Sequence, residues 1–267
     1  MTSKTQEWLP VELTGKTAVV CGSTQGIGFA AAQHLAGLGA RVLLLARNPE
    51  RLQSALAALP HSELHATAQA DFSKPDDVRR AIAEITERET VHILVNNTGG
   101  PAGGPIVDAD IEAFRNTFEQ HLICNHLLAQ AVLPGMKDAG YGRIINVIST
   151  SVKQPLANLG VSNTIRGAVA SWAKTWANEV GAFGVTVNNV LPGATNTSRL
   201  DQIISSKSDK TGRSQDEIRA QMAAAVPLNR TGNPEEVGRA IAFLASPSAS
   251  YISGINLPVD GGRTSSL

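Results

Sequence analysis

Short apolar runs and helix-like repeats alternate along most of the chain. Nearly continuous apolar runs predict buried strands at 17–21, 41–45, 64–69, 91–95, 143–148, 185–190 and 255–259. Between these runs, apolar residues recur at helical spacing over 26–38, 49–59, 75–88, 110–138, 157–182 and 234–245. A strand without a polar face has to be covered on both sides. The alternation therefore predicts an α/β fold, a Rossmann-like, doubly wound parallel sheet with helices on both faces.

The alternation of strand and helix patterns continues without a linker, a repeat or a low-complexity block. We therefore expect an N-terminal tail over 1–13 and a single domain over 14–267. One segment, about 197–225, interrupts the pattern, because a polar stretch at 205–210 precedes a helical pattern from Asp216 to Ala225. An insertion late in such a sheet lies near the carboxyl ends of the strands, where ligands bind. This segment is either a lid over the substrate or a disordered surface loop.

Composition narrows the class of protein. The 267 residues are 42% hydrophobic and 17% charged, which is typical of a globular domain. Lysine plus arginine equals aspartate plus glutamate, 23 against 23, so the charge balance indicates neither a nucleic-acid nor a membrane partner. Cys21 and Cys124 fall in a predicted strand and a predicted helix, which suits a reducing compartment. With no membrane-span run and no signal-peptide core in Met1–Leu13, we expect a cytoplasmic protein.

A glycine-rich segment follows the first predicted strand directly. It consists of Gly22, Ser23, Thr24, Gln25, Gly26, Ile27 and Gly28, and a helix pattern begins at once. Strand, glycine turn and helix together can hold a pyrophosphate, because the backbone approaches the phosphates and the helix N-terminus donates N–H groups. The spacing differs from the usual G-x-G-x-x-G, and a plain tight turn is the alternative. Its position at the opening of the first βαβ unit favours a dinucleotide site.

The end of the second strand bears on the choice of cofactor. In dinucleotide folds a carboxylate about 20 residues past the glycines holds the ribose of NAD, whereas an arginine accommodates the 2′-phosphate of NADP. Here the neutral Ala46 is followed by Arg47, which can bind a phosphate bidentately. The alternative is a solvated arginine at a helix start, and Gln25 adds no second positive charge inside the loop. We expect NADP(H).

Further motifs follow in order along the chain: Asp71-Phe72, Asn96-Asn97-Thr98-Gly99, Gly142-Arg143-Ile144-Ile145-Asn146, Pro192-Gly193 and Asp260-Gly261-Gly262. Together with the glycine segment, over about 14–263, they resemble the short-chain dehydrogenase/reductase family, in particular the branch that includes bacterial 3-oxoacyl-carrier-protein reductases. The resemblance implies a seven-stranded sheet, a nicotinamide cofactor and a homotetramer. It also places cofactor contacts on Asp71, Phe72, Asn97, Thr98, Gly99, Pro192, Gly193 and Thr195. The alternative for Asp71 and Asn97 is a strand-end cap or turn residue.

The catalytic positions implied by this resemblance are largely altered. The family uses an Asn, a Ser and a Tyr-x-x-x-Lys pair on one helix. Its serine falls on Ser149, whereas its asparagine, tyrosine and lysine positions hold His121, Ser162 and Arg166. A serine hydroxyl is a poor proton donor, and an arginine supplies charge and hydrogen bonds but no proton. Ser162 and Arg166 remain neighbours at i and i+4 on one helical face.

Two titratable residues could replace the missing acid. His121 is expected near Ser149 and titrates in the useful range, and Lys153 lies four residues past Ser149. The alternatives are a histidine satisfied by a neighbouring carbonyl and a solvated loop lysine. Tyr141 precedes the fifth strand, at the opposite end from the site, and Tyr251 is expected to pack before the last strand. No Cys/His cluster has metal-ligand spacing, so we expect no metal.

Two functions remain open from the sequence. The first is an NADP(H)-dependent oxidoreductase for a small carbonyl or alcohol substrate, with a rebuilt proton donor. The second is a nucleotide-binding protein of this fold that has lost catalysis and works as a sensor or partner subunit. Helix 157–182 also carries an apolar stripe formed by Ile165, Ala168, Val169, Trp172, Ala173 and Trp176. This stripe either packs on the sheet or joins subunits of the homotetramer.

Overall fold

The computed structural model describes residues 10–266 and contains one parallel sheet of seven strands. The strands are β1 (Thr17–Cys21), β2 (Arg41–Ala46), β3 (Ala66–Gln69), β4 (Ile93–Asn96), β5 (Gly142–Val147), β6 (Val185–Pro192) and β7 (Asn256–Val259). Their order across the sheet is β3-β2-β1-β4-β5-β6-β7, and every neighbouring pair is parallel. The predicted doubly wound fold is confirmed.

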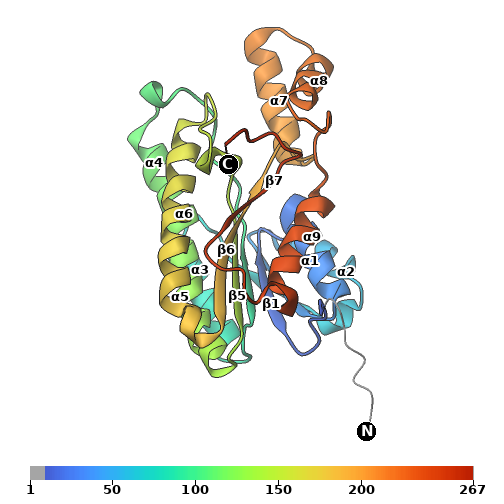
Figure 1. Cartoon of the computed structure of the whole chain (residues 1–267), viewed down its shortest axis with the longest axis vertical. Helices are drawn as coiled ribbons and strands as arrows, with labels where there is room; N and C mark the ends of the chain where they lie inside the picture. The colour runs from blue at the N-terminus through green and yellow to red at the C-terminus, as the bar shows by residue number, and fades with distance from the viewer. Residues whose placement is uncertain (1–9, 267) are drawn as a thin grey trace.

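Helices cover both faces of the sheet. They are α1 (Gly26–Gly37), α2 (Pro49–Ala57), α3 (Pro75–Thr86), α4 (Ile111–Phe118), α5 (Cys124–Asp138), α6 (Gly160–Val180), α7 (Ser198–Thr211), α8 (Gln215–Ala224) and α9 (Pro234–Ala245). Helices α1, α2 and α9 lie on one face and α3, α5 and α6 on the other (Figure 1). Successive β1 residues alternate between two cores, Val20 on the side of α1 and Val19 on the side of α3. None of these helices is long and apolar enough to cross a bilayer.

The strand order reverses between β1 and β4, which lie side by side in the sheet. The segments that leave these two strands begin with Gly22 and Asn97, so the glycine loop and the Asn97 loop meet at one edge. Ligands of open α/β sheets bind in the crevice at such a reversal. The fold therefore brings the two best sequence motifs together where a dinucleotide is expected.

A ladder of asparagine side chains crosses the sheet in register. The amide of Asn96 donates to Asn146 at 2.8 Å, Asn146 to Asn189 at 2.9 Å, and Asn189 to Asn256 at 2.8 Å. The first three residues are buried, so each amide replaces a solvent hydrogen bond with one from the neighbouring strand. The ladder ties β4, β5, β6 and β7 together close to their carboxyl ends.

The helix predicted over 110–138 is wrong in its middle. Helix α4 is followed by a π-helical segment, Glu119–Ile123, before α5 begins. A π-helical turn holds one more residue than an α-helical turn, and such turns occur frequently at functional sites. The buried residue of this segment is His121. A second, smaller difference is that the strand predicted over 64–69 begins at Ala66, because a 3₁₀ turn precedes it.

Part of the predicted N-terminal tail is packed against the domain. Leu13 is fully buried, and its backbone N–H donates to the carbonyl of Leu38 at 2.7 Å. The carbonyl of Pro10 accepts hydrogen bonds from the backbone and hydroxyl of Ser248. Residues 1–9 of the tail lie outside the described residues. The expectation that Tyr251 packs before the last strand is also wrong, because its side chain is fully exposed.

The segment expected at about 197–225 folds into two helices, α7 and α8, that project from the end of the molecule at which β6 finishes (Figure 1). The polar stretch 205–210 lies inside α7 and is helical. Leu200, Ile204 and Ile218 form a small buried cluster between the two helices. Arg219 and Asp201 join them at the surface with an ion pair of 2.8 Å. The segment therefore has a core of its own above the carboxyl edge.

Candidate active site

The glycine loop is shaped by contacts with the segment that leaves β4. Gly22 and Gly26 have φ values of +57° and +56°, which favour glycine. A Cβ on Gly28 would lie 2.3 Å from the carbonyl oxygen of Gly22, and one on Gly22 would lie 2.5 Å from that of Asn97. The Asn97 amide donates to the carbonyls of Cys21 and Gly22 at 3.2 and 3.3 Å. The spacing of the glycines thus follows from close backbone packing.

The same loop keeps donors free for an anionic ligand. The Ser23 hydroxyl is buried and has no hydrogen-bond partner within residues 10–266. Gln25 occupies the N-cap of α1 without capping it by its side chain, which leaves the N–H groups of the first turn open. A buried free hydroxyl and an uncapped helix N-terminus fit a diphosphate. Thr24 and Ile27 lie in the same turn, half-buried.

The turn that leaves β6 carries Pro192, Gly193 and Thr195, for which cofactor contacts are predicted. Strand β6 ends at Pro192, and a Cβ on Gly193 would lie 2.8 Å from Asp260. The hydroxyl of Thr195 donates to the Gly193 carbonyl at 3.1 Å, and the side chain is buried. Two residues later, Thr197 faces the glycine loop, with its methyl group 3.1 Å from a Cβ position on Gly26.

Arg47 and Asp71 lie at the ends of β2 and β3, on the same edge of the sheet. Arg47 is exposed, and its carbonyl accepts a hydrogen bond from Gln69 at 3.0 Å. Hydrogen bonds from the backbone and hydroxyl of Ser73 hold the pKa of Asp71 below its usual value, and the charge of Arg47 adds to this effect. Phe72 packs in the core beside these residues and accepts a weak hydrogen bond from the Cys124 thiol.

Ser149 leaves the end of β5 and caps a short 3₁₀ turn, Thr150–Val152. Its Oγ accepts a hydrogen bond from the backbone N–H of Ser151 at 3.1 Å. The side chain is half-buried. Because a lone pair of Oγ is occupied by the turn, the hydroxyl hydrogen remains available for an acceptor on a ligand.

Arg166 reaches from α6 to the same strand end. Its Nη1 donates to the carbonyl of Val147, two residues before Ser149, at 2.8 Å, and the side chain is 8% exposed. Burial, together with the charge of Arg199, lowers the pKa of Arg166 to about 10. Ser162 lies one turn earlier on α6 and is half-buried, with no side-chain hydrogen bond among the described residues. Arg166 therefore faces the end of β5.

The prediction that His121 titrates in the neutral range is wrong. The ring is 2% exposed, its Nδ1 lies 2.6 Å from the hydroxyl of Thr98, and its Nε2 is buried with no hydrogen-bond partner within residues 10–266. Burial, followed by the positive charge of Arg166, lowers the pKa of His121 to about 2. The imidazole is neutral near pH 7, so it lacks the second ring proton that an imidazolium ion would release as an acid. Thr98 and His121 nevertheless lie at the site, between Arg166 and the exposed Gly99.

Lys153 follows the turn that Ser149 caps. It is half-buried, and no carboxylate within the described part of the chain forms an ion pair with it. No group of three or more His, Cys, Asp or Glu side chains in that part could hold a metal ion. Ser149, Lys153 and Arg166 thus supply hydrogen bonds and positive charge, and no carboxylate within residues 10–266 pairs with them.

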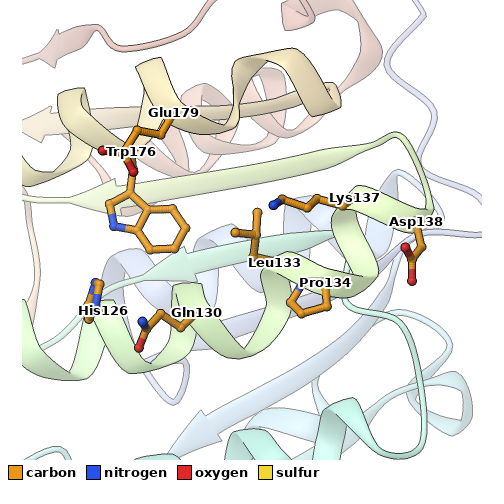
Figure 2. Close-up of a pocket in the computed structure, with 8 residues that line it drawn as sticks. All are labelled: His126, Gln130, Leu133, Pro134, Lys137, Asp138, Trp176 and Glu179. Atoms are coloured by element: carbon orange, nitrogen blue, oxygen red, sulfur yellow. The ribbon is translucent and has the colours of Figure 1, made fainter.

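A cavity of about 650 Å³ lies on a different part of the molecule (Figure 2). It sits between α5 and α6 and is lined by His126, Gln130, Leu133, Pro134, Lys137, Asp138, Trp176 and Glu179. None of the site residues predicted from the sequence lines it. Trp172 donates to His126 at 3.2 Å, and the rings of His126 and Trp176 meet edge to face. The cavity belongs to an aromatic helix face rather than to the carboxyl edge of the sheet.

Comparison with known proteins gives a consistent result. The sequence model described as enoyl-(acyl carrier protein) reductase matches residues 22–264. The 3-oxoacyl-[acyl-carrier-protein] reductase FabG of Vibrio cholerae is 35% identical over 255 residues, covering 94% of this chain and 98% of that protein. NADPH-dependent reductase BacG of Bacillus subtilis is 29% identical, covering 96% and 100%. The crystal structure of L-sorbose reductase from Gluconobacter frateurii with NADPH and L-sorbose matches with a TM-score of 0.90 at 29% identity, covering 97% and 100%.

Proposed function

The chain belongs to the short-chain dehydrogenase/reductase family of NAD(P)-dependent oxidoreductases, and we propose that it reduces a small carbonyl compound with NADPH. One observation carries the proposal: the hydrogen bond from Arg166 to the Val147 carbonyl, which holds the altered helix face of α6 against the strand end that carries Ser149. The substituted positions therefore still converge on one site. A relative and two solved structures named for NADPH support the cofactor.

Two regions of the chain would hold different parts of the cofactor. The glycine loop, with Ser23 and the N-terminus of α1, would hold the diphosphate, and Arg47 would hold the 2′-phosphate. Asp71, Asn97 and the Pro192–Gly193 turn line the groove between these regions. When bound, NADPH supplies the hydride that reduces the carbonyl carbon.

Ser149 and Arg166 stabilise the charge that develops on the substrate oxygen. The Ser149 hydroxyl is oriented by the N–H of Ser151 and donates its hydrogen to that oxygen. Arg166 adds a fixed positive charge close by, which is worth more in a buried site than in water. Both groups act without moving a proton, so their contribution is largely independent of pH near neutrality.

The proton has to come from another group. His121 is neutral and is excluded as the acid by its lowered pKa. Lys153 follows the Ser149 turn, and lysine is among the side chains that act as general acids in enzymes. We assign Lys153 as the proton donor and the Thr98–His121 pair as a positioning element that shapes the pocket wall. Helices α7 and α8 then act as a lid that covers the substrate over the carboxyl edge.

A screen of NADPH consumption against ketones and aldehydes tests the proposal. Ser149→Ala should lower turnover about 100-fold or more, the usual cost of removing a group that stabilises a developing oxyanion. Lys153→Met should lower turnover, whereas Lys174→Met, at an exposed position of α6, serves as the control and should leave it unchanged. NADPH binding without turnover of any carbonyl would favour the second function, a nucleotide sensor or partner subunit.

Assembly forms part of the same proposal. Trp172 and Trp176 are only half-buried, and they line an aromatic face that the sheet does not cover. The adjoining cavity between α5 and α6 gives a second copy of this face room to dock (Figure 2). We propose that α5 and α6 of two subunits pack together and that two such dimers form a homotetramer in the cytoplasm.

A further inference from the structure

Two arginine side chains from different elements converge on one glycine. Arg166 comes from α6, and Arg199 comes from the first turn of α7, in the proposed lid. A Cβ added to Gly100 would lie 3.9 Å from the Nη2 atoms of both residues. Arg199 Nη2 donates to the carbonyl of Pro101 at 2.5 Å, whereas Arg166 is held through Nη1 by the carbonyl of Val147. Each guanidinium group thus keeps further N–H donors beside Gly100.

The two guanidinium groups lack a counter-ion within the described residues. Within residues 10–266, no carboxylate lies within ion-pair distance of Arg166 or Arg199. By contrast, Arg219 of α8 pairs with Asp201 of α7 at 2.8 Å. Burying a charge without a partner is costly, and the proximity of Arg199 lowers the pKa of Arg166 further. The fold therefore holds two positive charges together and provides no negative charge to balance them.

The phosphate groups of the cofactor are matched by other residues than these two arginines. The diphosphate is matched by the glycine loop after β1, and the 2′-phosphate by Arg47 after β2. Arg166 is instead anchored two residues before Ser149, a distance that an extended chain spans in about 7 Å. Arg166 therefore lies at the strand end that carries Ser149, and Arg199 meets it beside Gly100.

We infer that Arg166 and Arg199 bind an oxyanion group of the substrate, so that this enzyme reduces anionic carbonyl compounds such as short oxo acids. The inference rests on the proposed reductase function and specifies its substrate class. Planar guanidinium groups match the two oxygens of a carboxylate or a phosphate, and an anion between them would neutralise both charges. Because Arg199 belongs to α7, the same anion would fix the lid over the site.

Paired substrates that differ only in charge test this inference. The initial rates of NADPH oxidation are measured with pyruvate and acetoacetate, and with the methyl esters of both acids. Dihydroxyacetone phosphate and dihydroxyacetone distinguish phosphate from carboxylate. We expect kcat/KM to favour the charged member of at least one pair. Arg199→Gln should reduce this preference about 10-fold to 100-fold, the range for losing a hydrogen bond to a charged group. Arg199→Lys should retain part of it.

Two controls separate substrate binding from other effects. Arg219→Gln, in the same lid but paired with Asp201, should leave the preference unchanged. The NADPH dissociation constant, measured by calorimetry, should be the same for wild type and Arg199→Gln. A weaker NADPH affinity with an unchanged acid-to-ester ratio would assign the arginines to the cofactor and overturn the inference. Arg199 is half-buried on a peripheral helix, so its variant remains informative even where Arg166→Gln does not fold.

The proposed anionic substrate class can be wrong while the proposed reductase function holds. Turnover of esters as good as that of acids in wild type would overturn it and leave the reductase intact. If no carbonyl is turned over, the same acids and esters are titrated into the NADPH-loaded protein by calorimetry. Binding of the acids alone, abolished in Arg199→Gln, would support the anion site without catalysis. Equal binding of both, or of neither, would refute it.

Discussion

His121 should make the protein sensitive to acid, and its replacement should reduce that sensitivity. The ring is buried beside Arg166, and its pKa falls from 6.5 in an open chain to about 2 in the folded protein. The unfolded chain therefore binds a proton more readily than the folded chain over this interval. The stability that neutral His121 provides is present in full above pH 6.5 and is lost progressively as the pH falls towards 2.

The magnitude follows from the two pKa values. Between pH 7 and pH 5, protonation of His121 in the unfolded chain should lower the free energy of unfolding by about 2 kcal/mol. His121→Asn replaces the ring with a neutral amide that can still hydrogen-bond Thr98. The variant should therefore lose about 2 kcal/mol less than wild type over the same pH interval. His34 and His92 also have lowered pKa values through burial, so the variant keeps part of the acid sensitivity.

Urea unfolding at pH 7, 6 and 5, followed by tryptophan fluorescence at one protein concentration, measures this difference. The comparison uses the change with pH within each variant, because the substitution itself shifts the absolute stability. His61→Asn is the control, since its side chain is 76% exposed and its replacement should leave the pH dependence as in wild type. Equal losses of stability for wild type and His121→Asn between pH 7 and pH 5 would refute the argument. An activity profile that loses an inflection near pH 6.5 in His121→Asn would refute it as well.

Four further outcomes are expected. Arg47→Ala should weaken NADPH binding by about 1.5–3 kcal/mol and leave NADH binding nearly unchanged in calorimetry, because only NADPH has a 2′-phosphate. Asn146→Leu should lower the free energy of unfolding by about 3 kcal/mol in urea titrations, since it leaves a buried amide and a buried carbonyl unpaired. Trp176→Glu should lower the molar mass measured by light scattering and leave the circular dichroism spectrum unchanged. Ser162→Tyr with Arg166→Lys should not raise NADPH turnover, because lysine lacks the planar guanidinium group that bonds Val147 and presents further N–H donors beside Gly100.

The fold could be predicted because its signals are local and repeated. Each strand is a continuous apolar run between turn residues, and all seven predicted runs correspond to strands within a few positions. The glycine loop was recognisable for the same reason, since Gly22 and Gly28 are fixed by contacts at the start of the first βαβ unit. What the periodicity could not show is the π-helical turn at Glu119–Ile123, because one inserted residue leaves the apolar pattern on either side almost unchanged.

The chemistry of the site was less accessible from sequence because it depends on burial. His121 was a candidate acid by residue type, yet its environment decides its charge: enclosure and the nearby Arg166 keep it neutral. The sequence did not predict the asparagine ladder, because each member lies on a different strand. Only the sheet register aligns Asn96 with Asn146. The sequence did not predict a role for Arg199 for a similar reason, because Arg199 contacts Pro101, which lies 98 positions away in the sequence.

The altered residues of the site form one connected set rather than scattered losses. His121 takes its lowered pKa partly from Arg166, and Arg166 takes part of its own from Arg199. A charged histidine beside two guanidinium groups would add a third positive charge, so a neutral ring is the form compatible with this pair. An oxyanion bound between Arg166 and Arg199 would also reduce the electrostatic repulsion between their positive charges. Arg166, which the resemblance aligns with the family's lysine, thus forms with Arg199 a pair of adjacent positive charges, and we propose a substrate with a negative group as their ligand.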